Sequence, residues 1–150
     1  MKKQLFRFWL LLAMLVSAPV FTGCSNDDNA TEQTEVTTIA DKVWAYAQDH
    51  PVGFTLNIRT MTAPTEGIAV AYADTQDSFD RGMLDFVVKH SLEHDGYVGG
   101  WYNSDDGRFY FDSTRIFPED QLEEAIKFGK ENGQYAIFIL STGTEVSLLD

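Results

Sequence analysis

The 150-residue sequence has one cysteine, few basic side chains and no apolar run long enough to cross a membrane. Cys24 is the only cysteine, so no disulfide can form within the chain. Lysine and arginine number 11 against 23 aspartate and glutamate, a formal charge of −12. This balance argues against binding nucleic acid or anionic lipid headgroups, because both attract clustered Lys and Arg. The longest apolar stretch, residues 8–21, has 14 residues, whereas a transmembrane helix needs roughly 20.

The N-terminus has the pattern of a signal peptide. Three basic residues lie in the first seven positions, and the short apolar stretch follows them directly. The stretch ends in residues 21–24 (FTGC), which resemble the lipobox of bacterial lipoproteins. There, a small residue precedes a cysteine that carries lipid. The resemblance implies a signal peptide over 1–23 and a lipid-modified Cys24 that holds the mature protein on a membrane.

The residues that follow the cysteine favour the outer membrane. Residues 24–28 (CSNDD) are similar to the short acidic surface-export signal of Bacteroidetes lipoproteins. Ser25 also stands where enterobacterial lipoproteins retained in the inner membrane have an aspartate. The expected location is therefore the cell outer membrane, with the protein displayed at the surface. A periplasm-facing anchor is the alternative.

The rest of the chain divides into a tether and one domain. Between residues 25 and 37 there is no aromatic side chain, and only Ala30 and Val36 are apolar. Such a segment buries too little surface to order itself, so residues 24–37 are predicted to be a flexible acidic tether. Residues 38–150 are long enough for a single domain with one core.

The periodicity of apolar residues in this domain predicts helices that alternate with pairs of strands. The order α-ββ-α-ββ-α-β indicates an α+β fold, with an antiparallel or mixed sheet and helices on one face. The strand predicted over residues 135–140 is almost continuously apolar and is expected to be central. The predicted helices cover 39–48, 77–96 and 118–132, and the predicted strands cover 54–59, 68–73, 97–102, 108–112, 135–140 and, beside the last, 145–149.

Three short segments of the domain resemble a small module of phage and mobile-element proteins. They are residues 99–102 (GGWY), 108–112 (RFYFD) and 132–138 (NGQYAIF). The resemblance covers roughly residues 53–148. It implies a small α+β unit and no assigned chemistry.

Residues 90–94 (HSLEH) match the H-x-x-E-H pattern of inverzincin metalloproteases. On a helix, His90 and His94 lie one turn apart, so both rings can reach one Zn²⁺ while Glu93 polarises its water. The pattern supports an alternative function, a small metal-dependent hydrolase. The sequence identifies no third ligand, however, and histidine is also favoured in the last turn of a helix. The preferred interpretation therefore assigns no catalytic residue, metal or cofactor.

An aromatic hairpin is the predicted binding surface. Alternation along its first strand places Gly99 and Trp101 on one face and Gly100 and Tyr102 on the other. Tyrosine, tryptophan and arginine are typical interface anchors, and glycines let another backbone or a ligand approach. The predicted function is non-enzymatic binding of a protein partner or a surface glycan. A cross-strand ladder that only stabilises the sheet is the alternative. The residues expected to bind are Trp101, Tyr102, Arg108, Tyr110 and Asp112.

Overall fold

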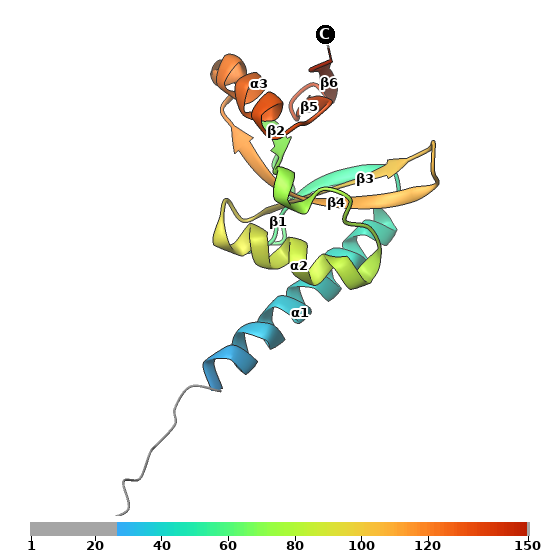
Figure 1. Ribbon diagram of the computed structural model, residues 1–150, viewed down its shortest axis with the longest axis vertical. Coiled ribbons are helices and arrows are strands. Elements are labelled where there is room, and N and C mark those ends of the chain that lie inside the picture. The colour runs from blue at the N-terminus through green and yellow to red at the C-terminus, as the bar shows by residue number, and fades with distance from the viewer. Residues whose placement is uncertain (1–26, 150) are drawn as a thin grey trace, which may run out of the picture.

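An antiparallel sheet of six strands, in the order β1-β3-β4-β2-β5-β6, organises the computed structural model, which describes residues 27–149 (Figure 1). Every neighbouring pair of strands is antiparallel. The predicted α+β class is confirmed. The strands are β1 (Gly53–Asn57), β2 (Ile68–Ala71), β3 (Tyr97–Asn103), β4 (Arg108–Phe117), β5 (Ala136–Ile139) and β6 (Thr144–Ser147); the helices are α1 (Asp27–Asp49), α2 (Asp80–Glu93) and α3 (Leu122–Glu131), with short 3-10 turns η1 (Ala73–Thr75) and η2 (Glu119–Gln121).

The long strand β4 joins two hydrophobic clusters on one face of the sheet. Phe111 belongs to the cluster beneath α1 and α2, and Phe117 belongs to the cluster beneath α3. The two residues are an even number of positions apart on an unbroken ladder, so their side chains leave the same face. All three helices therefore cover one face. The opposite face, called the open face below, carries no helix of the described residues.

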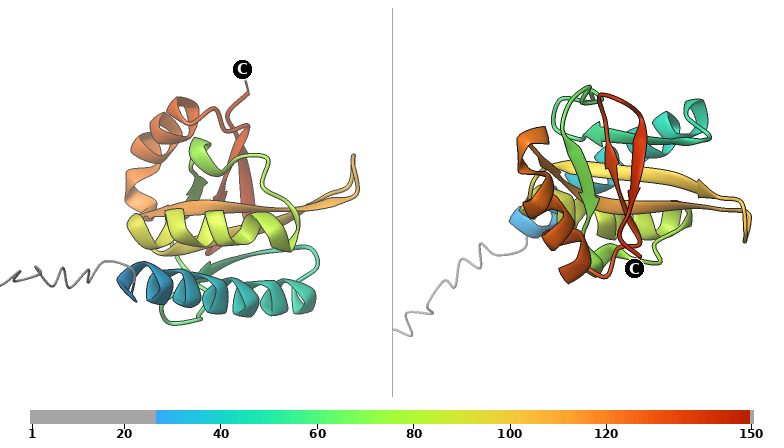
Figure 2. Two further views of the ribbon diagram at one scale, coloured as in Figure 1. Left: turned by 60° about the horizontal axis from the view of Figure 1, so that its bottom comes forward. Right: turned by 90° about the horizontal axis from the view of Figure 1, so that it is seen from above.

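The sheet is strongly twisted. In Figure 1, β3 and β4 run across the middle of the view, whereas β5 and β6 lie beside α3 at the top. The right-hand view of Figure 2 shows from above that the two pairs of strands cross. Helices α1 and α2 lie side by side under β3 and β4 in Figure 2. Arg81 on α2 fixes their relation, because its guanidinium donates to the carboxylate of Asp41 at 2.8 Å and to the carbonyl of Thr37 at 3.2 Å, both on α1.

Helix α1 corrects the predicted tether. It begins at Asp27, whereas the sequence predicted a tether over 24–37 and a helix from Ile39, so the boundary at residue 38 falls inside a helix. Val36 supplies the reason: its side chain is only 3 % exposed and packs in the cluster with Ala40 and Leu84. One apolar residue, placed one turn before the next, extends the buried stripe into a segment of otherwise polar composition.

Two helix starts and the position of one strand also differ from the prediction. Helix α2 begins at Asp80 rather than at 77 or 78, because residues 78 and 79 run beside β4 instead, with the Phe111 N–H donating to the Ser78 carbonyl at 2.8 Å. The residues after Pro118 form η2 before α3 begins. Strand β5, expected at the centre, lies second from the edge, between β2 and β6.

The predicted signal peptide and Cys24 lie outside the described residues. Within residues 27–149, no helix combines the length and apolar composition that a bilayer crossing requires.

We expect Val36→Ala to destabilise the domain, because it removes two buried methyl groups from a closed cluster. The free energy of unfolding should fall by about 1–2 kcal/mol, measured by urea denaturation of the mature chain. Thr34→Ala, at an exposed position of the same helix, should change it by less than about 0.5 kcal/mol. Equal effects of the two substitutions would mean that residues 27–37 do not pack as described.

Candidate binding site on the open face of the sheet

The register between β3 and β4 divides the predicted binding residues between the two faces of the sheet. Trp101 pairs with Tyr110, and Tyr102 pairs with Phe109. Trp101 and Tyr110 are therefore on the open face. Tyr102 lies on the helix-covered face, where it lines a shallow aromatic pocket with Trp44 of α1. Arg108 and Asp112 lie two positions before and two positions after Tyr110 on β4, so their side chains leave the same face as Tyr110. Four of the five predicted residues therefore share the open face.

Three aromatic rings form a row across the open face, which we call the aromatic row: Trp101, Tyr110 and Phe79. Trp101 and Tyr110 are stacked, with ring centroids 5.3 Å apart and planes 20° from parallel. Phe79 meets Tyr110 edge to face at 6.0 Å. The guanidinium of Arg108 lies 4.4 Å above the Phe79 ring and closes that end. These contacts fix the orientation of the rings but do not bury their whole surface, since 47 % of Trp101 remains exposed.

Phe79 was not predicted as part of the site. It precedes α2 and does not belong to a run of alternating apolar and polar residues that would predict a strand. It reaches the row because its backbone bridges to Tyr110 beside β4. Neither its spacing nor its neighbours in the chain indicate that bridge.

The middle ring of the row, Tyr110, is fixed by a hydrogen bond within the hairpin. The Tyr110 hydroxyl donates to the carboxylate of Asp106 in the turn between β3 and β4. This bond raises the pKa of Tyr110 and lowers the pKa of Asp106, since it stabilises the neutral phenol and the ionised carboxyl. The ring of Tyr110 is thereby oriented against Trp101.

The two adjacent glycines of β3 have different roles. A Cβ on Gly100 would lie 2.6 Å from the Phe54 ring and 2.7 Å from the Phe109 ring, so Gly100 makes room for core aromatics on the helix-covered face. Gly99 faces the other way. Its missing side chain makes room on the open face for the Thr114 hydroxyl, which would lie 2.8 Å from a Cβ at this position.

Asp112 is the electrostatically unusual residue of the site. Burial raises the pKa of its carboxyl from 3.8 to about 7, a hydrogen bond from the Trp101 side chain lowers it, and the nearby charge of Asp77 raises it further. The first effect is desolvation, which penalises the ionised form. Near neutral pH the carboxyl is therefore divided between its protonated and ionised forms.

The H-x-x-E-H residues lie at the C-terminal end of α2, whereas Phe79 of the aromatic row precedes its N-terminal end. The rings of His90 and His94 are stacked 3.9 Å apart, and His94 donates through Nδ1 to the His90 carbonyl at 2.7 Å. His90 Nε2 is 3.7 Å from the Asp74 carboxylate. The Glu93 side chain is 57 % exposed, and its carboxylate lies 4.0 Å from the Lys89 ammonium.

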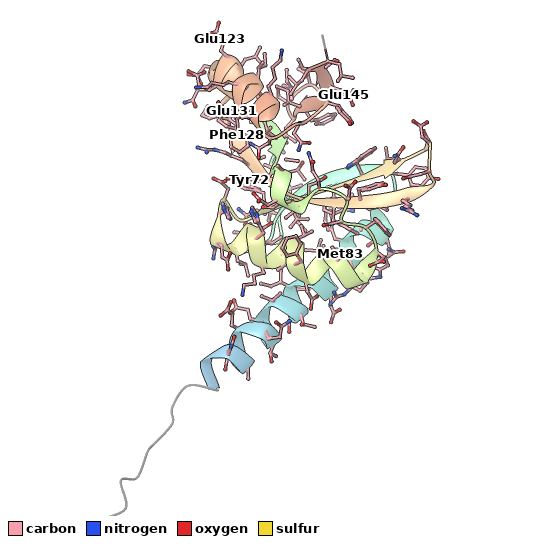
Figure 3. All side chains as sticks on the ribbon, viewed as in Figure 1. Tyr72, Met83, Glu123, Phe128, Glu131 and Glu145 are labelled. Atoms are coloured by element: carbon pink, nitrogen blue, oxygen red, sulfur yellow. The ribbon has the colours of Figure 1, made fainter. Side chains whose placement is uncertain are left out.

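The surroundings of these histidines indicate packing. Tyr72 contacts both rings, with centroids 5.2 Å from His90 and 5.0 Å from His94, and meets Phe128 of α3 at 5.2 Å. Figure 3 shows Tyr72 between α2 and α3. Burial, followed by the charge of His94, lowers the pKa of His90. In the part of the chain that the structure describes, no three His, Cys, Asp or Glu side chains are grouped to hold a metal ion.

No protein family, curated protein or solved structure matches the chain.

We expect Asp112→Asn to remove a pH-dependent loss of stability. In the wild-type protein the folded carboxyl titrates near 7 and the unfolded one near 3.8, so the folded state holds the extra proton. Its contribution to the free energy of unfolding therefore declines as pH rises from about 4 to about 7 and is constant above that. The amide resembles the protonated acid and does not ionise.

Urea denaturation between pH 5 and pH 8 measures this difference. The stability of the variant relative to wild type should rise by about 2 kcal/mol over that range, after discounting the part of the carboxyl that solvent screens. Asp105→Asn, at an exposed turn position, should follow the wild-type profile. Parallel profiles for wild type and Asp112→Asn would show that Asp112 is ionised throughout.

Proposed function

We propose that this is a lipid-anchored protein of the cell envelope whose domain binds a partner, without catalysis, through the aromatic row. The observation that carries the proposal is the stacked, half-exposed Trp101 with Tyr110 behind it on the face that no described helix covers. An aromatic side chain of this size is normally buried in a domain without a ligand. Its position on a rigid pair of strands, oriented by Asp106, is suited to recognition.

Anchoring is supported by the sequence. The lipobox-like residues 21–24 follow a short apolar stretch, and the acidic residues after Cys24 resemble a surface-export signal. We propose attachment to the outer membrane through lipid on Cys24, with the domain facing away from the bilayer.

A protein partner is the preferred ligand of the row. Tryptophan, tyrosine and arginine are the residues that contribute most at protein interfaces, and Trp101, Tyr110 and Arg108 stand together on one face. A surface glycan is the second candidate, because one side of the Trp101 ring faces Gly53 of β1, which has no side chain to cover it. The domain is strongly acidic, so an anionic polymer is disfavoured in either case.

The alternative hydrolase would need His90, Glu93 and His94 to act on one metal ion. That alternative has little geometric support, because the two rings stack on each other, Glu93 lies beside Lys89, and Tyr72 contacts both rings. We expect purified protein dialysed against micromolar zinc to retain well under one equivalent, measured by plasma mass spectrometry. One full equivalent, lost on both His90→Ala and His94→Ala, would favour the hydrolase over the binding module.

The proposed function is tested by capture from native membranes. After mild crosslinking, full-length tagged protein should recover one partner in comparable amount, identified by mass spectrometry. Trp101→Ala combined with Tyr110→Ala should reduce recovery by at least tenfold, because interface anchors of this type cost about 2 kcal/mol or more each when truncated. Tyr135→Ala is the matched control, since this tyrosine is 75 % exposed and lies outside the row.

Three results would contradict the proposal. The first is recovery of the same partner by the double variant. The second is an equal loss with Tyr135→Ala. The third is no partner and no quenching of Trp101 fluorescence by cell-surface glycans.

A further inference from the structure

The open face places an indole ring and a carboxyl on either side of a position without a side chain. Gly99 lies between Trp101 along β3 and Asp112 across the ladder on β4, with Thr55 of β1 on its other side. A Cβ built on Gly99 would lie 2.8 Å from the Thr114 hydroxyl, so the Thr114 side chain fills the space above this glycine. The Trp101 side chain donates a hydrogen bond to the Asp112 carboxyl, so the indole and the carboxyl are direct neighbours on the open face.

Asp112 has no counter-charge among the residues that the structure describes. Its carboxyl interacts with the neutral Trp101 side chain and with Asp77, which carries charge of the same sign. The two arginines of β4 are occupied elsewhere. Arg108 lies over Phe79, and the guanidinium of Arg115 lies 4.7 Å over the Phe117 ring on the helix-covered face. A partly buried carboxylate without a cation is unfavourable, and a bound cation would offset that cost.

The neighbouring indole suits the same kind of group. Trp101 is stacked on Tyr110 on one side and half exposed, and tryptophan is the best aromatic partner for a cation that lies over its ring. A planar guanidinium can stack on the ring while its N–H groups point at a carboxylate, which the compact ammonium of lysine cannot do. The formal charge of −12 attracts basic partners at longer range.

We propose that Trp101 and Asp112 together bind the guanidinium of an arginine side chain presented by a basic protein partner. The guanidinium stacks on the exposed part of the indole and donates hydrogen bonds to the neighbouring Asp112 carboxylate. This inference rests on the proposed function, because it names the chemistry that the partner brings to the end of the aromatic row.

The test compares N-acetylarginine amide with N-acetylcitrulline amide, which has the same shape and no charge. The full chain is labelled with ¹⁵N-tryptophan in detergent micelles, and the Trp101 indole signal is assigned with Trp101→Phe. At pH 8 the arginine probe should shift this signal saturably, with an affinity at least fivefold above that of citrulline. Asp112→Asn should reduce the arginine affinity to the citrulline level, whereas the control Asp105→Asn should leave it unchanged.

The pH dependence supplies a second readout. Because the pKa of Asp112 is raised to about 7, the arginine affinity should increase about tenfold from pH 6 to pH 8. The other titratable or charged groups that face Asp112 are Asp77, Tyr97, Tyr110 and Arg108. Loss of the increase in Asp112→Asn would assign it to Asp112 rather than to these groups.

The inference is overturned if citrulline binds as well as arginine, or if Asp112→Asn binds arginine as wild type does. Partner capture separates this failure from failure of the proposed function. If Asp112→Asn retains the partner that the Trp101→Ala, Tyr110→Ala variant loses, the aromatic row is the contact and arginine recognition is wrong. If the double variant also retains the partner, the proposed function itself is wrong.

Discussion

The register between β3 and β4 positions every residue of the candidate site except Phe79, which precedes α2. Side chains alternate between the faces of a sheet, so a slip of one residue would turn Trp101 toward the helices and bring Tyr102 to the open face. The turn fixes the register: the Gly107 N–H donates to the Asn103 carbonyl at 2.9 Å, and the Asp106 carboxylate accepts from the Arg108 N–H at 3.0 Å. The same carboxylate holds the Tyr110 hydroxyl. One aspartate therefore links the geometry of the turn to the orientation of the aromatic row.

Helices on only one face of the sheet give the domain two surfaces of different character. The covered face buries β4 from Phe111 to Phe117 in two clusters, and the open face retains Trp101 and the partly buried Asp112. A carboxyl that is half ionised near neutral pH lowers the stability of the free domain when it ionises. A ligand that favours the ionised form would reverse that loss. The ionised, partly buried carboxyl of Asp112 thus both lowers the stability of the free domain and provides the charge that a ligand would bind.

The sequence predicted the class of fold and most elements, because apolar periodicity is a local property. It also predicted that residues 97–112 form a hairpin with two distinct faces. It did not predict which residues of the two strands are opposite each other, since that depends on the turn, and so its binding residues include Tyr102, which lies on the helix-covered face. Phe79 joins the row through a backbone bridge that has no local signal. Val36 was missed because one buried methyl-bearing side chain does not alter the polar composition of its segment.

The extension of α1 changes how an anchored domain would be presented. A flexible tether leaves the orientation of the domain free, whereas a helix of 23 residues is a rigid rod about 34 Å long. Its C-terminal end lies against the hairpin, where the Tyr102 N–H donates to the Val52 carbonyl at 3.2 Å just beyond the helix. Its N-terminal end follows the proposed lipid attachment by only a few residues. With the helix upright, the aromatic row would stand roughly a helix length from the bilayer, which favours a partner beyond the headgroups over the lipid itself.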